Sequence, residues 1–311
     1  MINRHHLRVK LLQWLFASRQ QNQEDYREVA KQFKASASTS MRSYVMAFRL
    51  LDALIFYAGI RLEERQGRHL QVNRDPGPAH ALADNPLAPL LEKDPYYAVA
   101  LKSTGIENME ISTDMLRAMF ESVTEGTCTA SKNLSLDTLD GLKVFFDKCI
   151  CSGDWYPSWQ QEHNLYWDSD RYLIDRQVLQ TLDLMKAGSP FPDTKAMLQT
   201  WQSEDTMIQT LLESLLGNPS VHLERIEKHA GQWDPDRLAR MDLLLLQMAC
   251  TEWLLLPDVP VKVTMNEYIE LAKTFSTPQS SSFINGLLDK IKADLLREGL
   301  IQKTGRGLVE S

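Results

Sequence analysis

The sequence has few of the features that would place it in a membrane or an oxidising compartment. Its four cysteines are too few and too irregularly spaced for a disulfide framework, and no cysteine or histidine pairs have zinc-finger spacing. No run approaches the ~20 apolar residues that a membrane helix needs. The apolar stretch Leu11 to Phe16 follows basic residues, as in a signal peptide, but Gln13 interrupts it and no cleavage site follows. We expect a soluble, untargeted, cytoplasmic protein.

Motifs for catalysis are also missing. The glycines in stretches such as Gly105 and Gly217 are isolated, and no flanking strands support a nucleotide-binding loop. Cys149 and Cys151 have neither a base nor a glycine motif beside them, so two partly buried thiols are the ordinary interpretation. We expect no catalytic residue, no cofactor and no metal.

Charge is unevenly distributed along the chain. The net charge is −7, yet residues 1–74 carry 13 basic against 6 acidic side chains, whereas the remainder carries 21 against 35. Because salt screens charges beyond roughly 8 Å, a local basic segment can bind anions on an acidic protein. The basic segment is either an anion-binding face or an ordinary solvated helix face.

The hydrophobic pattern predicts an all-α bundle, since strand alternation is nowhere sustained. Residues 4–17 have one apolar stripe, with Arg4 and Arg8 together on the helix, and a second long helix is predicted over 40–66. Four prolines within 73–89 predict a linker or wrapped loop. Helical pieces should follow, with breaks at 102–111, 126–135 and 153–157, and then helices from 194 to 297. We expect four segments: basic helices 1–74, a helical insertion 75–193, a bundle 194–303 and a tail 304–311.

Three helices are predicted near the C-terminus. The first is buried, reaches Leu256 and includes Glu252; Pro257 and Pro260 then stop it. Thr264 and Glu267 have the spacing of a capping box, which predicts a helix start at Thr264. Another helix should begin at Thr277 and Pro278, with Gly286 allowing close helix contact.

Residues 259–273 have the sequence VPVKVTMNEYIELAK, and residues 283–290 have the sequence FINGLLDK. These segments resemble the patterns P-x-K-V-x-x-N-E-x-I-E-L-A-K and F-V-N-G-V-L-D-K of the NusB family of transcription antitermination factors. Arg4, Arg8 and the residues 13–16, QWLF, resemble the family's basic first helix. The resemblance covers about residues 1–20 and 200–303, and the enlarged middle is typical of long-form members.

The resemblance implies a non-enzymatic, RNA-binding NusB-like helical bundle. Such a protein binds boxA-type single-stranded RNA together with ribosomal protein NusE, in the transcription elongation complex that makes ribosomal RNA. Single-stranded RNA needs basic groups for phosphates and planar groups on which bases stack. The expected RNA-binding residues are Arg4, Arg8, Lys10, Gln13, Phe16, Gln279 and Phe283.

Some of these residues have a second interpretation. Phe16 and Phe283 also suit ordinary core packing at helical spacing. Gln247 and Ser282 stand where the family has basic residues, which predicts weaker RNA binding.

The expected partner-facing residues are Asp236 and Asp242, although Asp236 equally suits stabilisation of a helix start. Three alternatives stay open: a protein-interaction module that has lost RNA binding, a homodimer formed through the RNA-binding face, and a ribosomal RNA methyltransferase carrying a NusB-like domain. A methyltransferase needs a glycine-rich cofactor loop, and this sequence contains no such motif.

Overall fold

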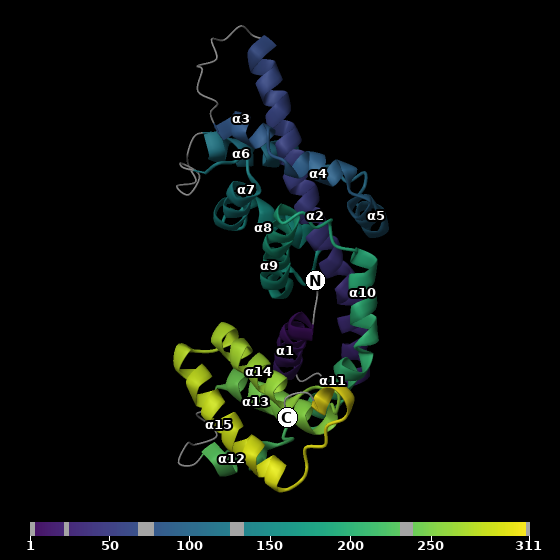
Figure 1. The fold of residues 1–311 in the computed structure, drawn as a ribbon, viewed down its shortest axis with the longest axis vertical. Coiled ribbons are helices and arrows are strands. Elements are labelled where there is room, and N and C mark those ends of the chain that lie inside the picture. The colour runs from purple at the N-terminus through teal and green to yellow at the C-terminus, as the bar shows by residue number, and fades with distance from the viewer. Residues whose placement is uncertain (1–3, 22–24, 68–77, 125–133, 231–238, 309–311) are drawn as a thin grey trace. The chain divides into compact units, whose positions relative to one another are not determined.

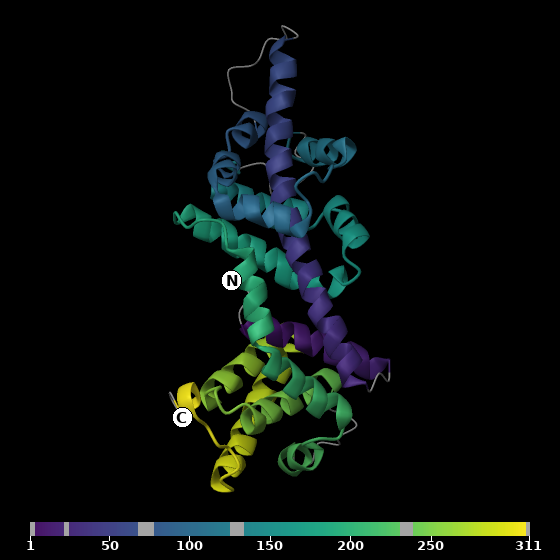
Figure 2. The same ribbon diagram turned by 90° about the vertical axis from the view of Figure 1, so that its right-hand side faces the viewer.

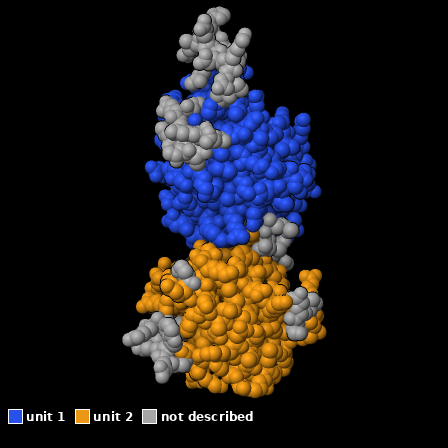
Figure 3. Space-filling model, turned by 60° about the vertical axis from the view of Figure 1, so that its left-hand side comes forward, with its two compact units in different colours: residues 1, 35–200 blue, residues 2–34, 201–311 orange. Residues whose placement is uncertain are grey.

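The structure is a computed structural model that describes residues 4–21, 25–67, 78–124, 134–230 and 239–308. All regular structure in these ranges is helical, which confirms the predicted all-α class (Figure 1). The chain divides into two compact units (Figure 3): unit 1 contains residues 35–200, and unit 2 contains residues 2–34 and 201–311. Across the described ranges, no helix has the length and apolar character needed to cross a membrane.

Unit 2 is a helical bundle with α13 at its centre. Residues 244–253 of this helix are all buried, because α13 packs against helices on several sides (Figure 1). The elements of this unit are α1 (Arg4–Gln20), the start of α2 (Tyr26–Gly67), α11 (Asp205–Gly217), α12 (Leu223–Ala230), α13 (Arg240–Leu255), α14 (Val261–Phe275), α15 (Pro278–Arg297) and the 3₁₀ turn η4 (Gly305–Leu308).

Of the three helices predicted near the C-terminus, the first ends as expected, since Leu256 is the C-cap of α13, whereas one of the other two predicted helix starts is wrong and one is confirmed. The predicted capping box is wrong, because α14 begins at Val261 after Pro260 and Thr264 lies inside the helix. The start of α15 is confirmed: Pro278 is in its first turn, and the Thr277 hydroxyl accepts a hydrogen bond from the Ser280 amide at 3.3 Å.

Unit 1 is built around the rest of α2. Figures 1 and 2 show shorter helices gathered around this long helix. Part of its core is an aromatic cluster of Tyr44, Phe48, Tyr97 and Phe191, with ring centroids 5.0–5.7 Å apart. The other elements are α3 (Pro78–Ala83), α4 (Leu87–Lys93), α5 (Pro95–Thr104), α6 (Thr113–Thr124), α7 (Leu139–Phe145), the π-helical turn η2 (Phe146–Ile150), α8 (Trp155–His163), α9 (Trp167–Lys186) and most of α10 (Thr194–Ser203).

The proline-rich segment is not the continuous loop that the sequence predicts. Its described part contains α3, which begins at Pro78, and the start of α4, where Pro86 is the N-cap. Proline suits the first positions of a helix, because those amides have no intrahelical acceptor. The predicted break at 153–157 is also shorter, because α8 begins at Trp155.

Candidate nucleic-acid interface

A buried ion pair holds the first helix in unit 2. The Arg8 guanidinium on α1 donates two hydrogen bonds to the Glu252 carboxylate on α13, at 2.9 and 2.7 Å. Their side chains are 1% and 0% exposed. Burial acts to lower the pKa of Arg8, but Glu252 raises it above its ordinary value. Arg8 is therefore a charged residue inside the bundle, with its charge directed at a carboxylate of the same chain.

Two side chains of α14 complete this network. The Thr264 hydroxyl donates to Glu252 at 2.8 Å, and the Tyr268 hydroxyl donates to it at 3.1 Å. Both residues belong to the segment 259–273 that carries the first sequence pattern. Burial, followed by the charge of Glu252, raises the pKa of Tyr268 well above its ordinary value, which keeps its hydroxyl protonated as a donor. The first sequence pattern therefore supplies two side chains that hold Glu252, and Glu252 in turn binds Arg8 and holds α1 in place.

Arg4 lies at the surface but also has acidic partners. Its guanidinium donates to Glu204 and to Asp258, both at 2.8 Å, and its side chain is 36% exposed. The next residue, His5, has its Nδ1 2.8 Å from the Glu267 carboxylate. The basic face predicted for α1 is therefore largely neutralised within unit 2.

The remaining candidates on α1 differ in exposure. Lys10 is fully buried, whereas Gln13 and Phe16 are half-buried. The Gln13 Oε1 has no hydrogen-bond partner in the described part of the chain. Of the RNA-binding candidates on α1, Arg4, Gln13 and Phe16 are therefore the ones whose side chains are partly exposed and can contact a ligand.

The start of α15 holds the other RNA candidates. Gln279 is exposed in the first turn, beside exposed Ser282 and half-buried Phe283. Asp242, predicted to face a partner protein, is 5% exposed. Its carboxylate accepts hydrogen bonds from Ser280, at 2.8 Å, and from Ser276. Asp242 therefore ties the start of α15 to α13. Asp236 lies outside the described residues.

The sequence did not reveal two features of the contacts between α1 and α13: the role of Arg19 and the partner of Glu252. Arg19, near the end of α1, donates to the Gln247 side chain at 2.7 Å and to the Leu215 carbonyl at 2.9 Å. Gln247 is buried and donates to two further carbonyls, so its amide suits the site for a structural reason. Glu252 was expected to be buried, but no local pattern reveals a partner 244 positions away.

The fold and the packing of its two sequence patterns against α13 define an all-α helical-bundle protein. Residues 177–293 match the model described as NusB family. Over 147 residues, the chain is 51% identical to "Transcription antitermination protein NusB" of Salinibacter ruber, covering 45% of this chain and 92% of that one. The chain therefore belongs to the NusB family.

Two further relatives carry the same name. The protein of Chloroherpeton thalassium is 42% identical over 100 residues, which is 32% of this chain and 47% of the relative. That of Bacillus licheniformis is 42% identical over 94 residues, which is 30% and 73% of the two chains. No solved structure matches the chain.

Proposed function

We propose that this protein is a cytoplasmic antitermination factor that binds boxA-like single-stranded RNA together with ribosomal protein NusE, within the elongation complex that transcribes ribosomal RNA. The observation that carries the proposal is the 51% identity over 92% of the Salinibacter ruber relative. The helical bundle of unit 2, which contains both sequence patterns, supports it.

The proposed RNA surface divides into contacting and positioning residues. Arg4, Gln13, Phe16, Gln279 and Phe283 retain exposed surface and are proposed to contact RNA. The phenylalanine rings provide stacking surfaces, and exposed groups near the start of α15 can donate to phosphates at a helix N-terminus.

Arg8 and Lys10 are buried, so we assign them the role of holding α1 in place. They would then affect RNA binding through the position of α1, without touching a phosphate.

NusE is proposed to dock near the start of α13. This is where the chain carries Asp236 and Asp242, whose carboxylates suit a basic ribosomal protein. Since Asp242 binds Ser276 and Ser280, its proposed role is to shape this surface.

The test measures binding of the full chain to a boxA-like RNA by fluorescence anisotropy, with and without NusE, across a salt series. We expect binding that NusE strengthens and that weakens as salt rises. Arg4→Ala should reduce the slope of log K against log salt by about 0.7, as expected for one lost phosphate contact to a single strand. Phe283→Ala should weaken binding by roughly fivefold to a hundredfold at unchanged slope, because stacking is worth about 1–3 kcal/mol per base.

Variants must be checked for folding before binding is compared. Glu162→Gln, an exposed carboxylate of unit 1, is the control for an unrelated surface change. Equal RNA affinity of the wild type, Arg4→Ala and Phe283→Ala, or no binding with NusE present, would contradict the proposal.

A second function is favoured by one specific observation. Arg4 and Arg8 both pair with carboxylates of their own chain, which leaves less charge for phosphates. A protein-interaction module on a NusB fold would bind NusE with little salt dependence and would not bind RNA.

A further inference from the structure

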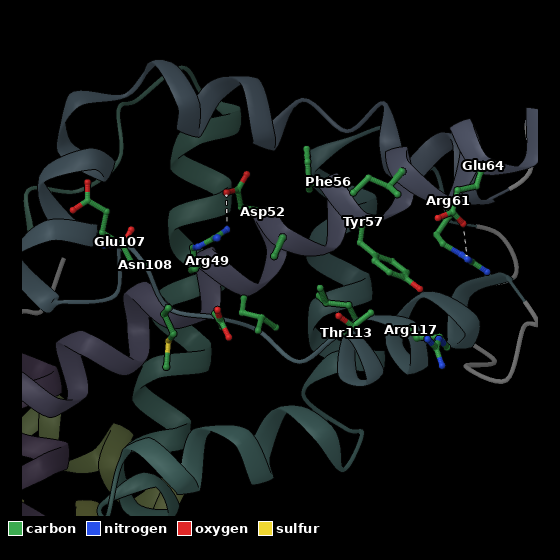
Figure 4. Close-up of a pocket in the computed structure, with 16 residues that line it drawn as sticks. Arg49, Asp52, Phe56, Tyr57, Arg61, Glu64, Glu107, Asn108, Thr113 and Arg117 are labelled. Atoms are coloured by element: carbon green, nitrogen blue, oxygen red, sulfur yellow. Dashed lines mark hydrogen bonds and ion pairs between the residues drawn. The ribbon is translucent and has the colours of Figure 1, made fainter. Parts of the chain in front are cut away.

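One face of α2 in unit 1 exposes large apolar side chains. Phe56 is 71% exposed and Ile60, one turn later, is 39% exposed. An exposed phenylalanine beside an isoleucine on a helix forms an apolar ridge, which is a common anchor for a partner protein. Figure 4 shows Phe56 and Tyr57 on this stretch of α2.

A groove lies on each side of the ridge. The first, of about 1020 Å³, lies between α2 and residues 107–117, which comprise the segment before α6 and its first turn (Figure 4). The second, of about 720 Å³, lies between α2 and residues of α3, α4 and α5. Asp52, Phe56 and Ile60 line both grooves. The ridge and its grooves therefore form one continuous surface, which we call the α2 face.

The charge of the α2 face is acidic. Asp52, Glu63 and Glu92 line the second groove, and among the described residues no lysine or arginine lines it. In the first groove, Arg49 pairs with Asp52 at 3.4 Å and Arg61 pairs with Glu64 at 2.7 Å (Figure 4). Arg117, the third arginine of this groove, pairs with Asp114 at 3.5 Å, so each of the three arginines is matched by a carboxylate. The second groove repels phosphates and favours a cationic ligand.

Two polar groups that line the second groove, the Tyr97 hydroxyl and the Asp52 carboxylate, would be stabilised by a cationic ligand. Tyr97 is 4% exposed, and its hydroxyl has no hydrogen-bond partner in the described part of the chain. Burial raises the pKa of Asp52 above its ordinary value; Arg49 opposes the shift, and the like charge of Glu92 adds to it. A cation placed among these groups would relieve the repulsion and offer a donor to the tyrosine oxygen.

We propose that the α2 face docks a basic amphipathic segment of a partner protein. The segment's apolar side chains cover Phe56 and Ile60, and its lysine or arginine enters the second groove between Asp52 and Glu92. RNA does not fit the second groove, because its phosphates would meet Asp52, Glu63 and Glu92, and no lysine or arginine of the described residues lines that groove to offset them. The site is separate from the proposed RNA surface, since all its residues belong to unit 1.

The test uses the full chain and an 18-residue peptide of leucine and lysine, with the leucines on one helical face. A scrambled peptide of the same composition and a leucine–glutamate peptide are controls. Gly59 permits a blocking variant, because an added Cβ there meets no atom within 4 Å and Gly59 lines the second groove. The variants are Gly59→Trp, Phe56→Ala and the double variant Glu63→Gln/Glu92→Gln. Asp137→Asn/Glu162→Gln is the charge-matched control at exposed positions.

We expect the amphipathic lysine peptide to bind the wild type and the control variant equally. Gly59→Trp and Phe56→Ala should each weaken binding about tenfold or more, and Glu63→Gln/Glu92→Gln should weaken it severalfold, with that difference lost at high salt. Circular dichroism and thermal melting check the fold. If Gly59→Trp does not fold, Phe56→Ala decides, because its ring is mostly outside the core.

Three outcomes would overturn the proposal. The first is unchanged binding by both Gly59→Trp and Phe56→Ala. The second is equal affinity for the scrambled or the leucine–glutamate peptide. The third is displacement of the amphipathic peptide by spermidine alone, which would identify a polyamine site in its place.

Discussion

Because Arg8 and Glu252 form a buried ion pair, the stability of unit 2 should depend strongly on Glu252. Removing the carboxylate with Glu252→Ala leaves the Arg8 guanidinium charged at 1% exposure, without its two hydrogen bonds and with only the more distant Glu267 carboxylate, at 3.7 Å, as an ion-pair partner among the described residues. Loss of one partner of a buried pair costs about 3–5 kcal/mol. We expect the free energy of unfolding of unit 2 to fall by about that amount in urea denaturation.

The matched variant for this prediction replaces both partners. Arg8→Met/Glu252→Met removes both charges and keeps apolar volume, so it should recover part of the lost stability, the rest being the cost of the Thr264 and Tyr268 hydroxyls losing their acceptor. A loss below about 1 kcal/mol in Glu252→Ala would contradict the assignment of Arg8 as a residue that holds the bundle together.

Asp175 should make the stability of unit 1 depend on pH. It lies on α9, where its carboxylate accepts a hydrogen bond from the Tyr156 hydroxyl at 3.1 Å. Burial raises its pKa from 3.8 to about 6. Between these values the folded state holds a proton that the unfolded state releases, so this residue's contribution to stability falls as pH rises from about 4 to 6.

The measurement compares wild type and Asp175→Asn in urea at pH 4 and pH 7. The wild type should lose up to about 3 kcal/mol relative to the variant over this range, because a tenfold change in proton affinity corresponds to roughly 1.4 kcal/mol. The exposed Asp168→Asn on the same helix is the control. An identical pH slope in wild type and Asp175→Asn would refute the raised pKa.

At this scale the sequence predicts which residues are buried better than it predicts their partners. The helical register correctly places Glu252 inside the bundle, because every third or fourth neighbour is apolar. It could not reveal Arg8 as the partner, since nothing local links α1 with α13. The same limit explains why Arg8 was expected to contact RNA.

At the scale of single elements, two glycines should respond oppositely to the same substitution. Gly286, in the middle of α15, has no atom within 4 Å of an added Cβ, so Gly286→Ala should stabilise the helix by about 0.5–1 kcal/mol. In η4, a Cβ on Gly307 would lie 2.0 Å from the Pro257 carbonyl oxygen, so Gly307→Ala should destabilise unit 2 by about 1–3 kcal/mol. Thermal melting checks both signs.

The structure therefore rejects the expectation that Gly286 allows a close helix contact. Destabilisation by Gly286→Ala would imply a contact at α15 that this structure does not contain.

Element boundaries were predictable where local chemistry alone decides them. Thr277 followed by proline starts α15 as expected, because the threonine hydroxyl and the proline both suit those positions. Thr264 did not start α14, because its hydroxyl is used by Glu252 of another helix. A tertiary contact thus replaced the local capping interaction that the sequence pattern predicted.

For the whole molecule, the helical class and the family were predictable from the sequence, but the division into units was not. The boundary between units falls inside α2, a continuous helix of 42 residues. A helix that continues through a boundary shows no proline, glycine or change of composition there. The four segments expected from composition therefore differ from the two units of the structure.

Each unit has its own buried core, which predicts that unit 2 can fold without unit 1. A variant in which a flexible glycine–serine linker replaces residues 35–200 retains α1, α11 to α15 and the Arg8–Glu252 network. We expect a helical circular dichroism spectrum and a cooperative thermal transition, because the network and the core around α13 lie entirely within the retained residues.

The control is Glu252→Ala in the shortened chain, which should abolish that transition because Arg8 loses the carboxylate that accepts both of its hydrogen bonds. RNA and NusE binding by the shortened chain should match the full chain, whereas binding of the amphipathic lysine peptide should be lost with the α2 face. If the shortened chain is unfolded, the core around α13 does not suffice to fold unit 2. If it still binds the peptide, the docking surface does not lie on the α2 face of unit 1.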